Sequence, residues 1–365
     1  MQTGSIENVA TQHGVTPLKL GEDVVDQIVA SENLPDWKHF ITRYHKQYKT
    51  LAEQMLRFQL FLASSIRVTT QWIAYKLNRA TFFYAINKFS DLKASERLQR
   101  YGLHIDEIDR QNEIDVGAHS SERTLSKRDI LGLFKSSTYS VDWRQNCLTK
   151  TILDQGECGS CYAMTAIKMV EWLYCRSRGK SMKFSEQFLV DCGEPFGLKG
   201  CEKGSILGAV NFIRSRGLLS SHVMPYLGAE QPNCPFPATT MSTDGLEYSQ
   251  ETIIPKEVNY KVLRTDSERL MELEHSPLVA LISIDSDFFD YRGGVYVRNP
   301  KASEEESVGH YMLLVGWGHD KRAGEFWLFS NHFGEDWGES NGYIRMARSP
   351  DDHILNIVKV VADFD

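Results

Sequence analysis

The cysteines of this 365-residue chain are confined to its C-terminal part. All seven follow residue 146, so a disulfide framework can form only in that part. An odd number of cysteines predicts disulfides together with one remaining reactive thiol. The seven positions are Cys147, Cys158, Cys161, Cys175, Cys192, Cys201 and Cys234.

The secondary-structure pattern also changes along the chain. Residues 37–75 carry apolar residues near the 3.6-residue helical period, and residues 82–92 are typical of a short strand and a turn. Residues 104–139 lose all periodicity. After residue 250, short runs rich in β-branched and aromatic residues dominate. A helical part followed by a β-rich part indicates two packed lobes of an α+β fold.

Composition excludes several classes of protein. The net charge is −7 and no dense basic run occurs, so we expect no nucleic-acid partner. No apolar run approaches the roughly 20 residues that span a membrane. The N-terminus shows no basic start followed by an apolar stretch, and so no visible signal peptide, which by itself favours the cytosol.

The segment LDQGECGSCYAMTAIKMVEWLYC, residues 153–175, carries two cysteines three positions apart before a helical pattern. Zinc ligation, a redox pair, a nucleophile or two buried thiols would each account for them. Zinc is disfavoured, because no second CxxC and no nearby pair of histidines follow. We expect Cys161 to begin the helix, where the macrodipole lowers the pKa of a thiol, and Gly179 to end it.

A thiolate nucleophile needs a histidine and a group that orients it. His310 stands just before an apolar, strand-like run, and Asn331 stands at the end of the next one. If these strands are adjacent, both side chains lie at one edge facing the Cys161 helix. The pattern alone leaves open that His310 is a core residue.

Several motifs resemble the papain-like cysteine proteases, of the cathepsin L type. They follow in the family's order from about residue 138 to 348: SVDWRQ, QGECGSCYA, FSEQFLVDCG, GCEKG, MPY, GHYMLLVGWG and SNHFGEDWGE. The resemblance implies the papain-like two-lobe fold, one helical and one β-barrel-like, and a cysteine endopeptidase that hydrolyses peptide bonds through a thioester.

The resemblance assigns roles at matching positions. It implies Cys161 as nucleophile, His310 as acid and base, and Asn331 as the residue that orients the imidazole. Gln155 and the backbone N–H of Cys161 would stabilise the oxyanion. No metal or other cofactor is expected.

The resemblance also implies two disulfides, Cys158 with Cys201 and Cys192 with Cys234. Such bonds need an oxidising compartment, which implies a lysosomal or secreted enzyme despite the absent leader pattern. Cys147 and Cys175 match no cysteine of the family, which leaves buried free thiols, the commoner outcome, or an extra bridge.

A set of residues matches positions that bind the peptide substrate: Lys203, Gly204, Ile206, Leu281, Gly309 and Tyr311. The pocket for the second residue before the scissile bond would be apolar and narrowed by Tyr311. Lys359 could form its floor and favour an acidic residue there. Phe333 replaces the tryptophan that usually shields the histidine–asparagine bond, which predicts a pair more exposed to water.

The N-terminal part resembles the family's inhibitory propeptide of the I29 type. The matching positions are Trp37, Phe40, Tyr44, Tyr48, Glu53, Arg57, Phe61, Ala85, Asn87, Phe89 and Asp91. The predicted parts are an extension (1–34), a propeptide domain (35–100), a linker crossing the cleft (101–137) and a protease domain (138–365). Cleavage is expected near residues 128–139.

The chain would thus be a monomeric zymogen whose partners are peptide or protein substrates and its own propeptide. A relative that lost activity and serves as a binding or structural protein is the alternative function. A redox or zinc protein is a third, but it leaves His310, Gln155 and Asn331 without a role.

Overall fold

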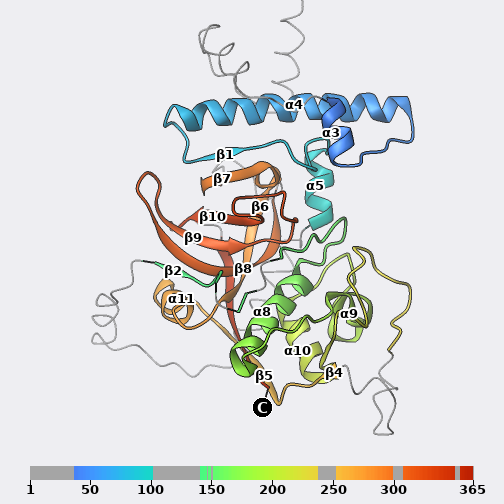
Figure 1. The fold of residues 1–365 in the computed structure, drawn as a ribbon, viewed down its shortest axis with the longest axis vertical. Helices are drawn as coiled ribbons and strands as arrows, with labels where there is room; N and C mark the ends of the chain where they lie inside the picture. Colours follow the sequence, from blue (N-terminus) through green and yellow to red (C-terminus); the bar gives the residue numbers. More distant parts are fainter. Residues whose placement is uncertain are drawn as a thin grey trace, which may run out of the picture.

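The structure is a computed structural model that describes residues 37–101, 140–145, 147–148, 151–236, 252–298, 307–349 and 354–364. Three parts follow one another along the long axis (Figure 1): an N-terminal unit in blue and cyan, a β lobe in orange and red, and a helical lobe mainly in green. The predicted extension, nearly all of the predicted linker and the expected cleavage region lie outside the described residues.

The N-terminal unit consists of α3 (Trp37–Arg43), α4 (Leu51–Lys76), β1 (Phe82–Tyr84) and α5 (Ala94–Tyr101). Thr50 caps α4, because its side chain accepts a hydrogen bond from the Glu53 N–H. Glu53 also forms an ion pair with Arg57, four residues later in the helix, at 3.8 Å. Among the described helices, none is both long and apolar enough to cross a membrane.

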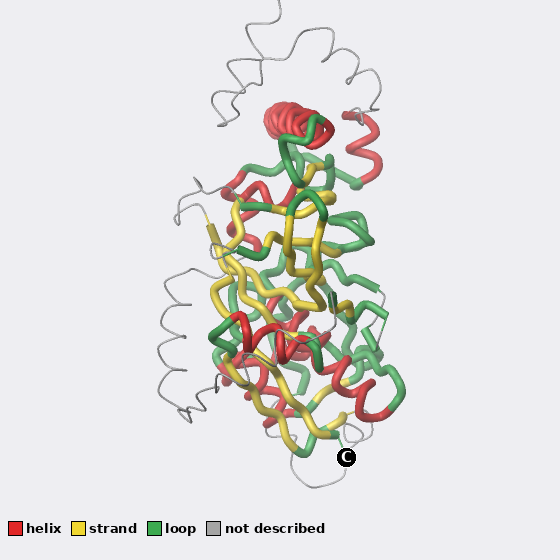
Figure 2. Tube along the Cα trace, turned by 90° about the vertical axis from the view of Figure 1, so that its left-hand side faces the viewer, coloured by secondary structure: helices red, strands yellow, loops and turns green. Residues whose placement is uncertain are grey.

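The N-terminal unit joins the β lobe as an additional strand. β1 pairs antiparallel with β7 (Tyr291–Tyr296), and Phe82 lies opposite Gly294. A side chain at Gly294 is excluded, since its Cβ would lie 2.3 Å from the Thr81 carbonyl oxygen and its φ is +89°. Figure 2 shows the yellow strands between α4, seen almost end-on, and the helices of the opposite end.

The β lobe is built on one mixed sheet. In the described residues nine strands join it, with β2 (Val141–Asp142) paired to β8 beside the main path β1-β7-β10-β9-β8-β6-β11-β5. The other strands are β5 (Glu257–Val262), β6 (Leu278–Asp285), β8 (Ser307–Asp320), β9 (Gly324–Ser330), β10 (Tyr343–Ala347) and β11 (Ile354–Asp363). Helix α11 (Asp266–Leu273) and the 3-10 turn η4 (Ser286–Asp290) connect them.

The alternation of side chains along these strands produces two cores. Leu281 and Tyr311 point to one face and pack with the helical lobe, whereas Ile282 and Met312 point to the other face. All four are buried. The first core therefore lies between the lobes, where it fixes the distance between the Cys161 helix and strand β8.

The helical lobe contains α8 (Cys161–Arg178), α9 (Glu186–Cys192), η1 (Glu194–Phe196) and α10 (Ile206–Arg216), with the short pair β3 (Leu218–Leu219) and β4 (Thr252–Ile253). Helix α8 begins at Cys161 and ends at Gly179, as expected. It does not bury a single face: polar Thr165, Lys168 and Glu171 are buried as well, because α8 is covered by both lobes.

Three disulfides cross-link the described part of the chain. Cys158 bonds Cys201 and Cys192 bonds Cys234, the pairings that the resemblance implies. The third joins Cys147 to Cys175, so the free-thiol alternative for these two residues is wrong. It ties the loop that follows β2 to the last turn of α8. Cys161 alone remains a thiol among the cysteines, all of which are described.

Candidate active site

Cys161 is presented by a tight turn at the start of α8. The Gly159 N–H donates to the Cys201 carbonyl, at 2.8 Å, directly beside the Cys158–Cys201 bridge. A Cβ at position 159 would lie 2.5 Å from that same oxygen, so only glycine allows this approach. The disulfide and the glycine together hold Cys161 as the first residue of the helix, 2% exposed.

The charge state of the thiol differs from the sequence expectation. Burial raises the pKa of Cys161 to about 11, although the backbone N–H groups of Tyr311, Tyr162 and Cys161 itself act to lower it. The helix terminus is present, but loss of solvent around the sulfur outweighs it. With this pKa, the buried Cys161 is a neutral thiol near pH 7.

His310 and Asn331 meet as predicted from adjacent strands. His310 Nε2 lies 2.8 Å from Asn331 Oδ1, and both residues are almost completely buried. The same Oδ1 accepts the His332 backbone N–H at 2.8 Å, so it is an acceptor and Nε2 carries the hydrogen. Nδ1 of His310 is then the basic nitrogen. His310 lies within β8, not before it, since the strand begins at Ser307.

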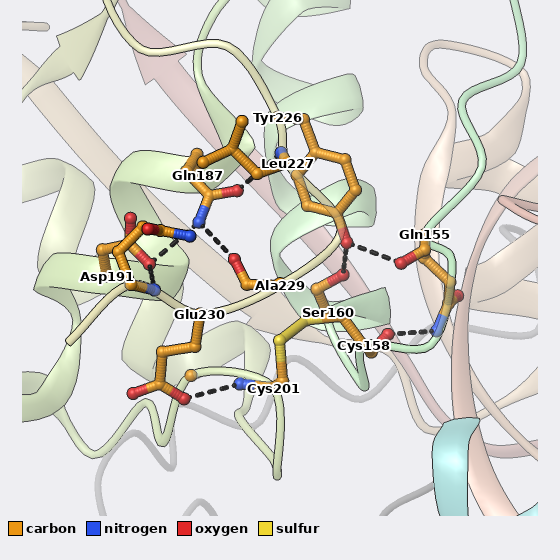
Figure 3. Close-up of a disulfide and its surroundings, with 12 residues drawn as sticks. Gln155, Cys158, Ser160, Gln187, Asp191, Cys201, Tyr226, Leu227, Ala229 and Glu230 are labelled. Carbon is orange, nitrogen blue, oxygen red and sulfur yellow. Dashed lines mark hydrogen bonds between the residues drawn. A yellow bond between two sulfur atoms is a disulfide. The ribbon is translucent and has the colours of Figure 1, made fainter.

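Gln155 lies beside the same turn and is fixed by three contacts, two of which appear in Figure 3. Its Nε2 donates to the Cys158 carbonyl at 2.9 Å, as Figure 3 shows. Its backbone N–H donates to the His332 carbonyl, also at 2.9 Å. The Tyr226 hydroxyl donates to the Gln155 carbonyl at 2.8 Å and lies 2.6 Å from Ser160 Oγ. Through these two contacts, the Tyr226 hydroxyl connects Gln155, before the turn, with Ser160, at its end. The MPY motif contains Tyr226, but sequence reasoning assigned it no role.

The histidine–asparagine pair is shielded from solvent by an aromatic cluster. The Phe333 ring lies 5.1 Å from the His310 ring and stacks on Phe289, and Trp337 packs against its edge. Phe89 of the N-terminal unit adds a fourth ring, 5.3 Å from Phe333. The prediction of a water-exposed pair is therefore wrong for this state, because neighbouring rings supply the cover that Phe333 lacks.

Three of the six predicted substrate-binding residues belong to the core between the two lobes. Leu281 pairs with Tyr311 across β6 and β8, while Ile206 begins α10, and all three belong to the core between the lobes. Gly204 lies on the Tyr162 ring, where a Cβ would approach within 2.7 Å. Lys203 is half-buried, and Gly309, the residue before His310, is buried.

Lys359 does not belong to this group. It stands between Val358 and Val360, which share the core with Leu281, so alternation directs Lys359 to the opposite face. There its Nζ lies 2.6 Å from a carboxylate oxygen of Glu272 on α11. The pocket-floor expectation is wrong. The half-buried Asn356 lies directly opposite Leu281 instead, a register that sequence alone did not reveal.

A buried polar cluster lies behind Asn331. Lys168, Glu171, Glu186, Asn331 and His332 line a cavity of about 20 Å³, room for about one water molecule. Burial lowers the pKa of Lys168 to about 7 and raises that of Glu186 to about 8. The Lys168 ammonium donates to Ser330 Oγ at 2.7 Å.

Comparison with known protein families identifies the family to which the chain belongs. Residues 137–361, more than half of the chain, match the papain family of cysteine proteases. The chain belongs to that family. Residues 37–96 match the cathepsin propeptide inhibitor domain, I29. This papain-family chain is therefore the zymogen of a cysteine endopeptidase, with the N-terminal unit as its intramolecular inhibitor.

Relatives share the layout of this protease along most of their length. A cathepsin L-like proteinase of Fasciola hepatica is 27% identical over 86% of this chain and 88% of its own. Ananain of Ananas comosus is 29% identical over 86% and 82%. The structure resembles digestive procathepsin L2 from Tenebrio molitor, with a TM-score of 0.69, 24% identity and coverage of 90% of this chain and 98% of that one.

The redox and zinc interpretations of CGSC do not fit the protease. Cys158 is bonded to Cys201, so it cannot pair with Cys161 or join it as a metal ligand. The two cysteines of the motif have separate environments, one in a disulfide and one as a thiol at a helix start.

Proposed function

We propose that Cys161, His310, Asn331 and Gln155 form the catalytic site of this protease. The observation that carries the proposal is the 2.8 Å bond between His310 Nε2 and Asn331 Oδ1. It fixes the imidazole tautomer whose Nδ1 can accept a proton, and Cys161 is the thiol that supplies one.

The residues support a complete acyl-transfer cycle. His310 takes the thiol proton, and the Cys161 sulfur attacks the peptide carbonyl carbon. The oxyanion is bound by the Cys161 N–H and the Gln155 amide, whose position Cys158 and Tyr226 fix. The imidazolium then donates its proton to the leaving amine. Water, deprotonated by His310, hydrolyses the thioester and restores the thiol.

The proposed substrate cleft lies between the lobes. Gly204 and Lys203 form its rim on one side, and Gly309 stands next to His310 on the other. Ile206, Leu281 and Tyr311 supply an apolar pocket, and Asn356 lies opposite Leu281 on the neighbouring strand. Such a pocket favours an apolar side chain at the second residue before the scissile bond. Peptides varied at that one position test this, and a preference for an acidic residue would contradict it.

The cross-links support a proposal for the compartment. Because the three disulfides of the described residues persist in oxidising surroundings, we propose that the enzyme is lysosomal or secreted. We also propose that it acts as a monomer.

Labelling with a thiol-directed epoxide after mild acid treatment tests the catalytic assignment. We expect labelling of the wild type only after propeptide release, and none of Cys161→Ala. A processed protein that stays unlabelled and does not cleave peptides would instead support a non-catalytic binding role.

A further inference from the structure

His332 occupies the point where the parts of the proposed site meet. It directly follows Asn331 and is 2% exposed. Its backbone N–H donates to Asn331 Oδ1 at 2.8 Å, and its carbonyl accepts the Gln155 N–H at 2.9 Å. The peptide groups of this one residue thus join the segment of Asn331 to that of Gln155.

The ring of His332 reaches the two remaining parts of the site. Its Nε2 lies 2.7 Å from the Tyr311 carbonyl oxygen and 3.0 Å from Thr165 Oγ1. Tyr311 follows His310 on β8, and Thr165 lies one helical turn after Cys161 on α8. Since a carbonyl only accepts, Nε2 must carry a hydrogen, and the ring acts as a donor between the lobes.

The geometry of the sheet explains why a side chain is needed there. Strand β9 ends at Ser330, which lies opposite Leu313 of β8. Tyr311 lies two residues earlier along β8, so its backbone N–H and C=O point to the same side as those of Leu313. Strand β9 has ended at this level and offers no backbone partner for them. The His332 ring instead donates a hydrogen bond to the Tyr311 carbonyl. The Tyr311 N–H faces the Cys161 sulfur and acts to lower the pKa of the thiol.

The surroundings keep the ring of His332 neutral. Burial, and then electrostatic interaction with His310 and Lys168, holds the pKa of His332 well below its usual range. A neutral ring can stand beside His310 without repelling the imidazolium that forms during reaction. Ionisable groups lie on every element packed around the ring. They are His310 on β8, Cys161, Lys168 and Glu171 on α8, Lys183 in the loop before α9, Glu186 at the start of α9, and Tyr343 on β10.

We propose that His332 is a positioning residue, which holds Tyr311 and the Cys161 helix in the arrangement that stabilises the thiolate–imidazolium pair. This rests on the proposed roles of Cys161 and His310. The donor hydrogen on Nε2 is the property that matters. A glutamine in its place retains an N–H donor on a side chain of similar reach, whereas leucine fills the space without one.

The test compares His332→Leu and His332→Gln in the acid-processed enzyme, with His319→Gln, an exposed histidine on the β8–β9 hairpin, as the control. Rates are measured per site titrated with the epoxide, so unfolded molecules are not counted. For His332→Leu we expect kcat to fall about tenfold, the effect of one buried hydrogen bond, with KM little changed. The pH midpoint of alkylation by iodoacetamide should rise by about one unit. Both values should return largely to normal in His332→Gln.

Two results would overturn the proposal. One is a His332→Leu enzyme with unchanged kcat and alkylation profile and only a lower melting temperature, which is a structural role. The other is a glutamine variant as impaired as the leucine variant. If His332→Leu does not fold, His332→Gln and Thr165→Val take its place. The proposal is then contradicted when Thr165→Val has a normal alkylation profile and His332→Gln has a lowered kcat.

The catalytic assignment has its own test. Wild-type enzyme that never labels at Cys161 refutes that assignment, whatever the His332 variants do.

Discussion

Arg97 of the propeptide and Asp290 of the protease form an ion pair with a nitrogen–oxygen distance of 3.1 Å, and both side chains are almost fully buried. Arg67 of α4 binds the same carboxylate. Burial alone raises the pKa of Asp290, but the two arginines outweigh it and lower the pKa overall. One carboxylate at the end of η4 is therefore the convergence point of two propeptide elements, α4 and α5.

Replacing Arg97 should loosen the propeptide strongly. Arg97→Met leaves a buried carboxylate with one partner fewer, a change that costs about 3–5 kcal/mol in other buried pairs. Because the pKa of Asp290 is lowered in the docked state, its contribution persists at pH 5 and is lost only as the pH falls below the ordinary aspartate value near 3.8. We expect activity to appear more than tenfold faster at pH 5. The control is Arg43→Met, whose pair with Asp336 is largely exposed and worth about 0–1 kcal/mol; an equal effect of both changes would contradict the prediction.

The tip of the β8–β9 hairpin should contribute a smaller part of the inhibition. Arg322 donates to the Tyr75 carbonyl at 2.9 Å and also to that of Ala80, and its guanidinium stacks on the Tyr75 ring. These contacts hold the end of α4, but they are exposed. Arg322→Ala should speed zymogen activation about three- to tenfold, as expected for an exposed cation–π contact with two hydrogen bonds. The processed enzyme should be unaffected; a lower kcat after processing would mean that the hairpin also serves the active site.

The Cys147–Cys175 bond should stabilise the processed enzyme. It closes a segment with a sequence separation of 28, for which chain entropy predicts about 3–4 kcal/mol. The double variant Cys147→Ser, Cys175→Ser should lose about that free energy of unfolding in guanidinium titrations, with little change in kcat. Cys161→Ser breaks no bridge and is the control. A stability equal to that of the control would show that the bond constrains neither state.

The buried Glu186 should make stability depend on pH. Burial, reinforced by Glu171, raises its pKa to about 8, so the folded protein binds more protons than the unfolded chain between pH 4.5 and 8. The free energy of unfolding therefore falls as the pH rises through that window. Glu186→Gln should reduce this fall in melting experiments at pH 5 and pH 8. A slope as steep as that of the wild type would place the proton elsewhere in the cluster.

Local sequence determined the features that depend on neighbours along the chain. The start of α8 at Cys161, its end at Gly179 and the place of Asn331 after a strand follow from apolar periodicity and from the glycine that ends the helix. The division into a helical and a β-rich part was readable for the same reason. The resemblance added the pairings of Cys158 and Cys192, which spacing cannot select among the possible connections.

Tertiary structure decided the features that depend on which surfaces face each other. The sequence does not show which of Val358 and Lys359 faces the core between the lobes; the register of β11 with β6 decides it. Likewise, only the fold brings Cys147 to Cys175. His332 has no local signal at all: its ring contacts residues 21 and 167 positions away. Periodicity in the sequence indicates whether a side chain is buried, but it does not indicate which residues pack against that side chain. The identity of the partner, and with it the protonation of a buried thiol or histidine, is set by three-dimensional packing.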